Sequence, residues 1–351
     1  MMLRRVAYVV NVFPKLSETF IAVELAELCR RRVEVVVLSL RQPAERMHHE
    51  FIVRAGLIER TVHGPREFSA TLREFRPEVL HAHFATEPTS MARQLAAELG
   101  IPFTFTAHGY DVYRRPPGDF AARAAAAGAV VTVSEANACH ITKSFGVPPH
   151  HIRVIPCGVD TDRFWAHGER SKPPHVVCVA RLNPVKNLGL LLEACAVLKT
   201  RKVSFRCVVL GDGPCRIELE TTRAQLGLEN TVEFVGAAEQ SEVLKWWRRA
   251  TVGVLTSESE GMPVCLMEAA ACGVPVVATA IGGVPELVQD GVTGLLTQPG
   301  DGLALAGALE RLLREPKTAA RMGAAARRRA EGHFSVRRQV DQLSEMWAGV
   351  V

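Results

Sequence analysis

Two carboxylates, Glu260 and Glu268, stand on either side of the start of a short predicted helix. Residues 256–279 read as the end of a buried strand, a tight turn, a helix with Pro263 at its first position, a turn at Gly273 and a second buried strand. In parallel α/β proteins, ligands bind at the carboxyl edge of the sheet, where this helix start is expected. Backbone N–H groups at a helix start suit a phosphate, and carboxylates suit sugar hydroxyls. The stretch therefore predicts a ligand that is part phosphate and part polyol, as a nucleotide-sugar is.

Two cations, Arg181 and Lys186, lie five residues apart in a loop that follows a predicted strand and opens a helix. The planar fork of arginine and the mobile point charge of lysine can both aim at one anion. The alternative is a pair of solvated surface cations. A single histidine, His108, follows another predicted strand and precedes Gly109, so it is placed to reach a ligand at the same kind of edge. Its alternative is a structural histidine with satisfied hydrogen bonds.

Three polar residues, Ser17, Glu18 and Thr19, occupy the loop after the first predicted strand. We expect Ser17 to be the N-cap of the helix that follows, and the loop is a candidate for ligand contact. The alternative is a helix cap with no further role. Asp111, three residues after His108, could orient that histidine or cap the next turn.

Short apolar strands alternate with helical segments along the whole chain, which predicts an α/β fold with parallel sheets. The 351 residues suffice for two domains, each with its own core. Strands are expected at 6–12, 33–40, 79–83, 102–107, 130–134, 152–155, 176–180, 205–210, 232–235, 252–256 and 275–277. Helices are expected at 20–30, 67–75, 88–99, 134–145, 188–200, 215–226, 239–250, 303–313, 317–331 and 336–347. The polar segment 164–174 is the predicted interdomain linker.

Composition excludes several classes of protein. The chain has 48% hydrophobic and 23% charged residues, typical of a globular protein, and no apolar run of the ~18–20 residues that span a membrane. Its nine cysteines form no C-x-x-C pair, which predicts reduced thiols and a cytoplasmic location. We expect no metal site, because His81 and His83 lack a nearby third ligand. The basic clusters at 4–5, 30–32 and 327–329 have no interleaved aromatics, so we expect no nucleic acid partner, while contact with the inner face of the plasma membrane stays open.

The stretch from Glu260 to Glu268 resembles the E-x7-E signature of family 4 retaining glycosyltransferases, which have the GT-B fold. The loop with Arg181 and Lys186 resembles the element of this family that holds the donor diphosphate, with Asn187 where glycine is usual. The run at His108 resembles an element near the donor sugar, and Gly211 and Val235 lie in segments that the family places near the nucleotide. The loop at 13–21 looks like the branch that builds bacterial exopolysaccharides such as colanic acid, and it lacks the adjacent glycines of many members.

This resemblance implies two Rossmann-like domains with parallel sheets facing across a cleft. They are an acceptor domain at 1–165, a nucleotide-sugar domain at 166–333, and a helix at 334–351 that crosses back to the first domain. It also implies a retaining enzyme that moves a hexose from a UDP- or GDP-sugar to a glycan or lipid-linked acceptor, with neither cofactor nor metal. The catalytic residues would be His108, Glu260, Lys186 and Arg181. The donor would be bound by Arg181, Lys186, Gly211, Val235, Glu260, Gly261, Met262, Pro263, Val264 and Glu268.

Two rival interpretations remain. One is a catalytically silent nucleotide-sugar-binding partner in a polysaccharide assembly complex. The other is a phosphorylase-like enzyme of the same fold that would use pyridoxal phosphate, although the sequence offers no clear Schiff-base lysine. The sugar, the base and the acceptor cannot be read from the residues.

Overall fold

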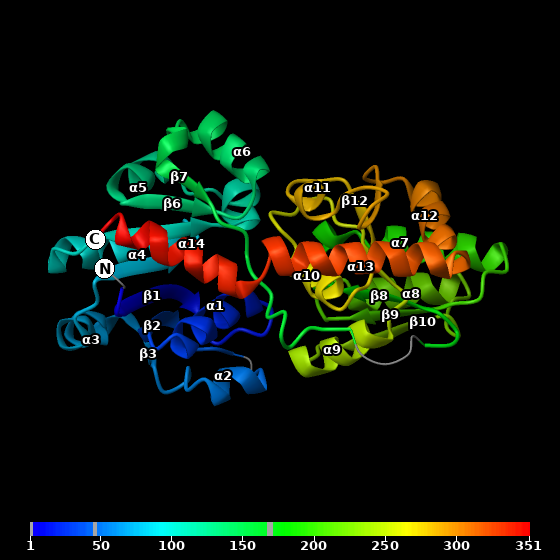
Figure 1. Ribbon diagram of the computed structural model, residues 1–351, viewed down its shortest axis with the longest axis horizontal. Helices are drawn as coiled ribbons and strands as arrows, with labels where there is room; N and C mark the ends of the chain where they lie inside the picture. The colour runs from blue at the N-terminus through cyan, green and yellow to red at the C-terminus, as the bar shows by residue number, and fades with distance from the viewer. Residues whose placement is uncertain (1–2, 45–47, 167–170) are drawn as a thin grey trace. The chain divides into compact units, whose positions relative to one another are not determined.

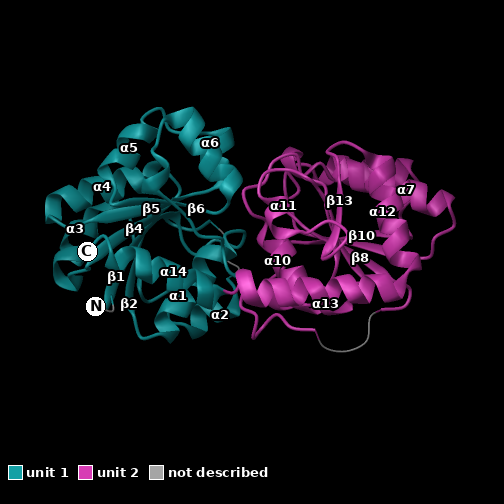
Figure 2. Cartoon of the chain, turned by 45° about the horizontal axis from the view of Figure 1, so that its top comes forward, with its two compact units in different colours: residues 1–158, 336–351 teal, residues 159–335 magenta. Residues whose placement is uncertain are grey.

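A computed structural model describes residues 3–44, 48–166 and 171–351. The chain divides into two compact units, Met1–Gly158 with Val336–Val351 and Val159–Ser335 (Figure 2). The first transition therefore comes at 158/159, before the expected boundary at 165/166, and the second at 335/336 rather than 333/334. The predicted linker at 164–174 belongs to the second unit, and part of it lies outside the described residues.

The first unit is built on a seven-stranded parallel sheet of order β3-β2-β1-β4-β5-β6-β7. Its strands are β1 (Arg5–Val12), β2 (Glu34–Arg41), β3 (Thr61–His63), β4 (Val79–His83), β5 (Phe103–Ala107), β6 (Ala129–Thr132) and β7 (Ile152–Val154). Its α-helices are α1 (Thr19–Arg30), α2 (Glu50–Arg54), α3 (Phe68–Phe75), α4 (Glu87–Leu99), α5 (Phe120–Ala126), α6 (Glu135–Phe145) and α14 (Val336–Ala348).

Side chains of this sheet alternate between two apolar cores, as the period of a strand requires. On β1, Val6 and Tyr8 pack into the core that contains α1 and α14, while Ala7 and Val9 pack into the core that contains α3 and α4. Both faces of the sheet are thus covered (Figure 1). This explains why its strands read as continuous aliphatic runs.

The second unit repeats the plan with a six-stranded parallel sheet of order β10-β9-β8-β11-β12-β13. Its strands are β8 (His175–Val179), β9 (Arg206–Leu210), β10 (Val232–Gly236), β11 (Val252–Leu255), β12 (Val276–Thr279) and β13 (Gly294–Thr297). Its α-helices are α7 (Leu188–Thr200), α8 (Arg216–Gln225), α9 (Gln240–Arg249), α10 (Val264–Ala271), α11 (Val284–Leu287), α12 (Gly302–Arg314) and α13 (Pro316–His333).

Each sheet has a point at which the strand order reverses, between β1 and β4 in the first unit and between β8 and β11 in the second. Chains leaving two neighbouring strands there diverge to opposite faces, which opens a crevice at the carboxyl edge. The loops after β1, β4, β8 and β11 are therefore the places where side chains can meet a ligand. Many of the residues singled out from the sequence lie on the loops after β1, β8 and β11 and on the loop after β5, whereas Gly211, Val235 and Glu268 lie elsewhere in the second unit.

Candidate functional site

The loop after β8 carries the two predicted cations of the second unit. Arg181 is exposed, and its guanidinium has no hydrogen-bonded or ionic partner among the described residues. Lys186 is instead paired with Glu260, which comes from the loop after β11, and Ser257 Oγ donates to the same Glu260 oxygen at 2.7 Å. The structure therefore brings Lys186 and Glu260 together and leaves Arg181 open to solvent.

The environment of Lys186 keeps it charged. Burial acts to lower the pKa of this lysine, but the neighbouring charge of Glu260 and the hydrogen bond to it outweigh burial, so the pKa is raised. The Lys186 and Glu260 side chains are 19% and 11% exposed. A half-buried cation of fixed position beside a carboxylate can hold an anion and a hydroxyl at the same time.

Hydrogen bonds to backbone carbonyl groups connect the segments that carry the ion pair. Thr256 Oγ1 donates to the carbonyl oxygen of Lys186 at 2.8 Å, and Glu258 N donates to that of Val185 at 2.8 Å. Thr279 Oγ1 donates to the carbonyl oxygen of Ser257 at 2.6 Å. The ion pair thus stands on a rigid base.

Two glycines let further backbone approach this base closely. A Cβ at Gly282 would lie 1.9 Å from the carbonyl oxygen of Glu260, and one at Gly211 would lie 1.9 Å from that of Ala180. Both have positive φ, +47° and +134°, which disfavours other residues. Gly211 therefore supports the loop that carries Arg181, because its backbone packs directly against the carbonyl group of Ala180.

Helix α10 begins beside Glu260, with one correction to the sequence-based prediction. Pro263 precedes the helix in an extended conformation (φ −77°, ψ 109°), and Val264 is the first helical residue. Pro263 therefore acts as the N-cap, not as the first helical position, although its carbonyl already accepts from Leu266 N at 3.1 Å. Gly273, at φ +64°, directly follows the C-cap Cys272, as expected. The first N–H groups of a helix have no acceptor within it, so Val264 and Cys265 present donors at this edge.

Glu268, the second of the two predicted carboxylates, is more deeply buried than Glu260. Glu268 is 5% exposed and accepts a hydrogen bond from Gln240 Nε2 at 3.0 Å, while Arg163 donates to the amide oxygen of Gln240 at 2.7 Å. Burial raises the pKa of Glu268 to about 7, and hydrogen bonds from Gln240 and Trp247 oppose this rise. Its expected contact with a ribose stays a prediction.

The remaining predicted donor residues lie on separate segments of the second unit. Gly211 follows β9, and Val235 is a half-buried residue of β10 next to an irregularity in its pairing with β9. Gly261 and Met262 are buried between Glu260 and α10, and the carbonyl of Gly261 accepts from Gly283 N at 3.1 Å.

In the first unit, His108 is 8% exposed and directly follows β5. Asp111 accepts from His108 N at 2.9 Å and also from Ala85 N, so its carboxylate ties two loops together through their backbones. Neither role considered for Asp111 is shown, because its carboxylate accepts from backbone amides and not from the His108 ring, and the helical turn Tyr110–Arg114 has no side-chain cap. Burial raises the pKa of Asp111 to about 7 against the effect of these hydrogen bonds.

Two residues connected to His108 by hydrogen bonds, His83 and Glu24, were not identified as functional from the sequence. His83 Nδ1 is 3.1 Å from His108 Nε2, and His83 Nε2 is 3.3 Å from Glu24 Oε1. A signal for Glu24 existed, because this charged residue falls on the apolar stripe of its helix, between Ile21 and Leu28. His83 shares one strand face with His81, but a strand pattern alone does not say which helix faces it.

The loop after β1 departs from the prediction. Helix α1 begins at Thr19, its N-cap is Glu18, and no side chain caps it, so the assignment of Ser17 as N-cap is wrong. The reason is a tight turn in which Glu18 N donates to the carbonyl of Lys15 and the two side chains form an ion pair. The helix therefore begins one residue later than it would with Ser17 as its N-cap.

Among the described residues, one buried group could hold a metal ion by its geometry: Glu24, His81 and His83, whose ligand atoms lie within 4.8 Å of one another. The statement that His81 and His83 lack a nearby third ligand is therefore wrong, because Glu24 of α1 is distant in sequence and close in space. However, both nitrogens of His81 are hydrogen-bonded to Thr104 and Thr106, at 2.8 and 3.0 Å. A metal would have to displace these bonds. The expectation of no metal stays a prediction.

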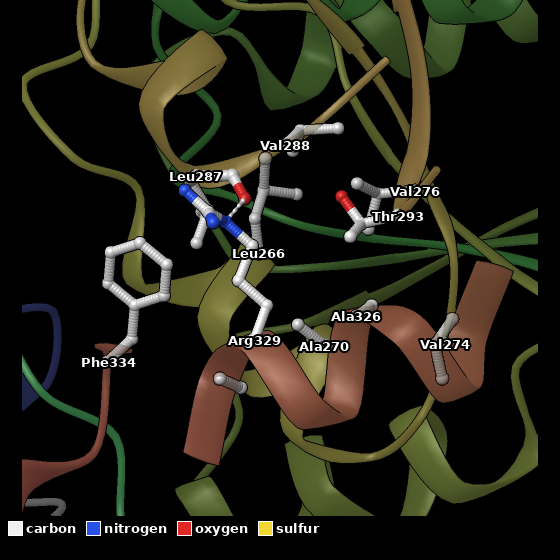
Figure 3. A pocket seen from close by; sticks show the side chains of 11 residues that line it. Leu266, Ala270, Val274, Val276, Leu287, Val288, Thr293, Ala326, Arg329 and Phe334 are labelled. Atoms are coloured by element: carbon white, nitrogen blue, oxygen red, sulfur yellow. Dashed lines mark hydrogen bonds between the residues drawn. The ribbon is translucent and has the colours of Figure 1, made fainter. Parts of the chain in front are cut away.

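Several arginines of the basic clusters make structural contacts. Arg327 donates to the carbonyl oxygens of Phe164, Ala271 and Thr161, and Arg31 contacts Glu27 and Asp341. Arg329 donates to the carbonyl oxygen of Leu287 at 3.0 Å, at the edge of a cavity of about 10 Å³ (Figure 3). That is room for about one water molecule, not for a nucleotide. No helix within the described residues has the length and apolar character needed to cross a bilayer.

Comparison with known proteins assigns both units. A family model described as "Glycosyltransferase Family 4" matches residues 17–163, and one described as "Glycosyl transferases group 1" matches residues 159–329. The D-inositol 3-phosphate glycosyltransferase of Frankia alni is 31% identical over 287 residues, which cover 73% of this chain and 70% of that protein. The chain belongs to glycosyltransferase family 4.

Relatives of this family 4 chain include proteins named for exopolysaccharide synthesis. The amylovoran biosynthesis glycosyltransferase AmsK of Erwinia amylovora is 34% identical over 215 residues, 59% of this chain and 53% of that protein. A WcaL protein of Salmonella typhimurium, named for colanic acid biosynthesis, is 41% identical over 175 residues, 48% of this chain and 43% of that protein. The chain thus spans about half the length of these two relatives.

Solved structures confirm the fold. The Anabaena protein HepE, crystallised in complex with UDP-glucose, superimposes with a TM-score of 0.81 at 19% identity, covering 98% of this chain and 99% of that one. Sucrose-phosphate synthase of Thermosynechococcus elongatus gives a TM-score of 0.79 at 21% identity, with 98% of each chain covered. The two Rossmann-like domains of this family 4 chain are therefore those of the GT-B fold, as predicted.

Proposed function

We propose that this family 4 chain is a retaining glycosyltransferase that moves a hexose from a UDP- or GDP-sugar to a glycan or lipid-linked acceptor in exopolysaccharide synthesis. The observation that carries the proposal is the pairing of Lys186 with Glu260 at the strand-order reversal of the second unit, beside the start of α10. A cation, a carboxylate and helix N–H groups at one edge match a ligand that joins a diphosphate to a sugar.

In this mechanism the second unit binds the donor. Arg181, Lys186 and the N–H groups of Val264 and Cys265 neutralise the charge that develops on the departing diphosphate. Preorganised donors of this kind stabilise a transition state because they need no rearrangement when charge appears. Glu260 accepts hydrogen bonds from sugar hydroxyls, and Glu268 contacts the ribose. These cations take the place that a divalent metal fills in other transferases, so no metal is required.

The first unit supplies the acceptor site, and its His108 supports the sugar as the bond to the phosphate breaks. We propose that the new bond forms on the face that the diphosphate leaves, and that the leaving phosphate helps to deprotonate the acceptor. A double displacement would need a carboxylate nucleophile in the first unit, as in retaining glycosidases. Asp111, the carboxylate nearest in sequence to His108, is buried and occupied by two backbone amides, which disfavours that route.

The relatives support parts of this proposal. The names of AmsK and WcaL support a role in exopolysaccharide synthesis. The complex of HepE with UDP-glucose supports a UDP-sugar as donor, whereas the name of a Mycolicibacterium smegmatis relative, 32% identical over 243 residues, specifies GDP-mannose. The base therefore has to be decided by experiment. We place the protein in the cytoplasm, where nucleotide-sugars are available, with acceptor access at the inner face of the membrane.

A thermal-shift panel of UDP-, GDP- and ADP-sugars tests the donor, because a ligand that binds only the folded state raises the melting temperature. With the donor identified, Glu260→Gln should abolish transfer while the nucleoside diphosphate still binds by calorimetry. Loss of nucleotide binding in this variant would show that Glu260 has another role. The coupling constant of the anomeric proton in the product reports retention.

The same assay distinguishes an enzyme from the alternative, a catalytically silent nucleotide-sugar-binding partner. An enzyme of this class hydrolyses its donor slowly when no acceptor is present. Stabilisation by one nucleotide-sugar without any donor hydrolysis over long incubation would support a binding partner in an assembly complex. Absence of stabilisation by any nucleotide-sugar at millimolar concentration would contradict both.

A further inference from the structure

A line of buried polar side chains runs through the first unit from α1 to His108. Glu24 and His83 are each 1% exposed. His83 Nε2 is 3.3 Å from Glu24 Oε1, and His83 Nδ1 is 3.1 Å from His108 Nε2. A buried carboxylate and two buried imidazoles are costly unless they are hydrogen-bonded, so this line is a specific arrangement and not a by-product of packing.

Both oxygens of Glu24 accept hydrogen bonds. Tyr8 Oη donates to Oε1, which also faces His83, and Gln339 Nε2 of α14 donates to Oε2. Gln339 is itself fixed, because its amide oxygen accepts from Gly158 N at 2.7 Å. Each oxygen of Glu24 thus already accepts from one donor, and the arrangement is complete when Glu24 acts as an acceptor toward His83 as well.

An acceptor at Glu24 determines where the protons of the two histidines lie. His83 must carry a hydrogen on Nε2 to donate to Glu24, so in its neutral form Nδ1 is an acceptor. His108 must then carry its hydrogen on Nε2, and its Nδ1 keeps a lone pair. Among the described residues nothing is hydrogen-bonded to that Nδ1. Phe20 and Phe84 pack against the His108 ring with centroids at 4.7 Å and hold its orientation.

The groups around this line are compatible with the assignment. Burial and the neighbouring His83 hold the pKa of His108 well below its usual range, so His108 is neutral at pH 7. Tyr8 of β1 has its pKa raised by burial and by Glu24, which keeps its hydroxyl a donor. Burial, with His83 and His108 nearby, lowers the pKa of His81, and Asp111 and Cys157 have raised pKa values because they are buried.

We infer that Glu24 and His83 are positioning residues that hold His108 in the Nε2-protonated tautomer, so that its unprotonated Nδ1 accepts a hydrogen bond from a sugar hydroxyl. The inference rests on the proposed function, since it assigns the partner of His108 as a hydroxyl of the donor or acceptor sugar. Glu24 and His83 do not touch the substrate. They act through His108, in the way that a carboxylate orients a functional histidine elsewhere.

The direct test reads the tautomer without any substrate. Long-range ¹H–¹⁵N spectra of the ¹⁵N-labelled full-length protein at pH 7 distinguish the two neutral tautomers and the imidazolium, and His108→Gln identifies the signals of His108 among the 12 histidines. We expect His108 to carry its proton on Nε2. An Nδ1-protonated or a charged His108 in the wild-type protein overturns the inference, whether or not transferase activity is found.

The second test uses Glu24→Gln with Tyr8→Phe as its matched control. Glu24→Gln replaces the acceptor with an amide, whereas Tyr8→Phe removes another hydrogen bond to Glu24 and leaves the line from Glu24 to His108 intact. Orienting partners of this type contribute about 10- to 100-fold. We expect Glu24→Gln to lower kcat by that factor with a donor KM within about twofold of wild type, and Tyr8→Phe to keep kcat within about threefold.

The outcomes separate this inference from the proposed function. If no nucleotide-sugar is turned over, the tautomer of His108 still decides the inference. If Glu24→Gln transfers sugar at the wild-type rate and His108 keeps its tautomer, Glu24 does not position His108. If Glu24→Gln does not fold, His83→Gln replaces it in the same comparison, and the wild-type spectrum remains decisive.

Discussion

The ion pair of Lys186 and Glu260 fixes the positions of two opposite charges beside the start of α10. An unpaired charge in a half-buried position is costly, and each of these groups relieves the other. In the proposed mechanism, a diphosphate at Lys186 would be a new partner for the lysine, while Glu260 would keep its bond from Ser257 and bind sugar hydroxyls. On this proposal, the charge of Lys186 is fixed in place before the donor binds.

Replacing Lys186 with alanine should lower turnover by on the order of 10²- to 10³-fold, the usual loss for one preorganised electrostatic contact. The measurement is kcat at saturating donor. Lys245→Ala is the matched control, because Lys245 also pairs with a glutamate, Glu242 at 2.9 Å, but on the exposed surface of α9. It should leave kcat unchanged. Near-normal turnover in Lys186→Ala would remove this lysine from the mechanism.

The raised pKa of Glu268 predicts that the stability of the folded protein depends on pH. Its pKa is raised to about 7 in the folded protein from an ordinary value of 4.5. Between these values the folded state holds a proton that the unfolded state has released, so stability falls as pH rises through this window. Glu268→Gln mimics the protonated form and should escape this loss. We expect its melting temperature to match wild type at pH 4 and to exceed it at pH 8 by calorimetry. Equal melting temperatures at pH 8 would mean that Glu268 titrates normally.

At the scale of elements, the sequence predicted the long helices and the central strands well. Helix α7 was predicted at its observed bounds, because a periodic apolar run begins and ends there without ambiguity. The elements that were missed are short: α2, α5 and α11, with the edge strands β3 and β13. β3 has three residues, all half-buried, so it carries no apolar run, and only its pairing with β2 makes it a strand.

The site was predictable where a motif fixes a loop and not where two elements only meet in space. Lys186 and Glu260 lie 74 residues apart, yet each was found from the loop that carries it. Glu24 and His83 belong to a helix and a strand without such a motif, and their contact depends on how α1 packs on the sheet. Ser17 failed as an N-cap because a salt-bridged turn of Lys15 and Glu18 competes with side-chain capping.

Because Gly211 supports the loop that carries Arg181, its replacement by alanine should disturb that loop. Alanine there would place Cβ at 1.9 Å from the carbonyl oxygen of Ala180 at a φ of +134°, so the loop with Arg181 must shift. We expect Gly211→Ala to weaken donor binding at least tenfold by calorimetry and to lower the melting temperature.

Gly307 is the matched control for this substitution. It lies inside α12, and a methyl group added there would have no atom within 4 Å apart from its chain neighbours and the backbone of its own helix. Gly307→Ala should therefore raise stability by about 0.5–1 kcal/mol and leave donor affinity unchanged. Equal donor affinity in the two alanine variants would show that the loop tolerates the displacement.

At the scale of the whole molecule, helix α14 belongs to the same unit as the first strand, β1. Helix α14 follows the second unit in sequence but packs in the core of the first, where Val340, Leu343 and Trp347 are buried against α1 and β1. Trp347 Nε1 donates to Thr104 Oγ1 at 3.1 Å, and Gln339 bonds to Glu24. The first unit therefore needs α14 to complete its core, and its polar line to His108 depends on the same helix.

Trp347→Ala should destabilise the first unit while sparing the second. Trp347 is fully buried beside Tyr8 and His81, and truncating a buried tryptophan costs about 3–5 kcal/mol. In hydrogen exchange, the slowest amides of β1, β4 and β5 should exchange about 10²- to 10⁴-fold faster, and those of β8, β9 and β11 should keep their rates. Trp165→Ala is the control, because Trp165 is 42% exposed in the second unit and should change neither set. An equal acceleration in both sheets of Trp347→Ala would mean that the two units unfold as one, so that α14 stabilises the whole chain and not the first unit alone.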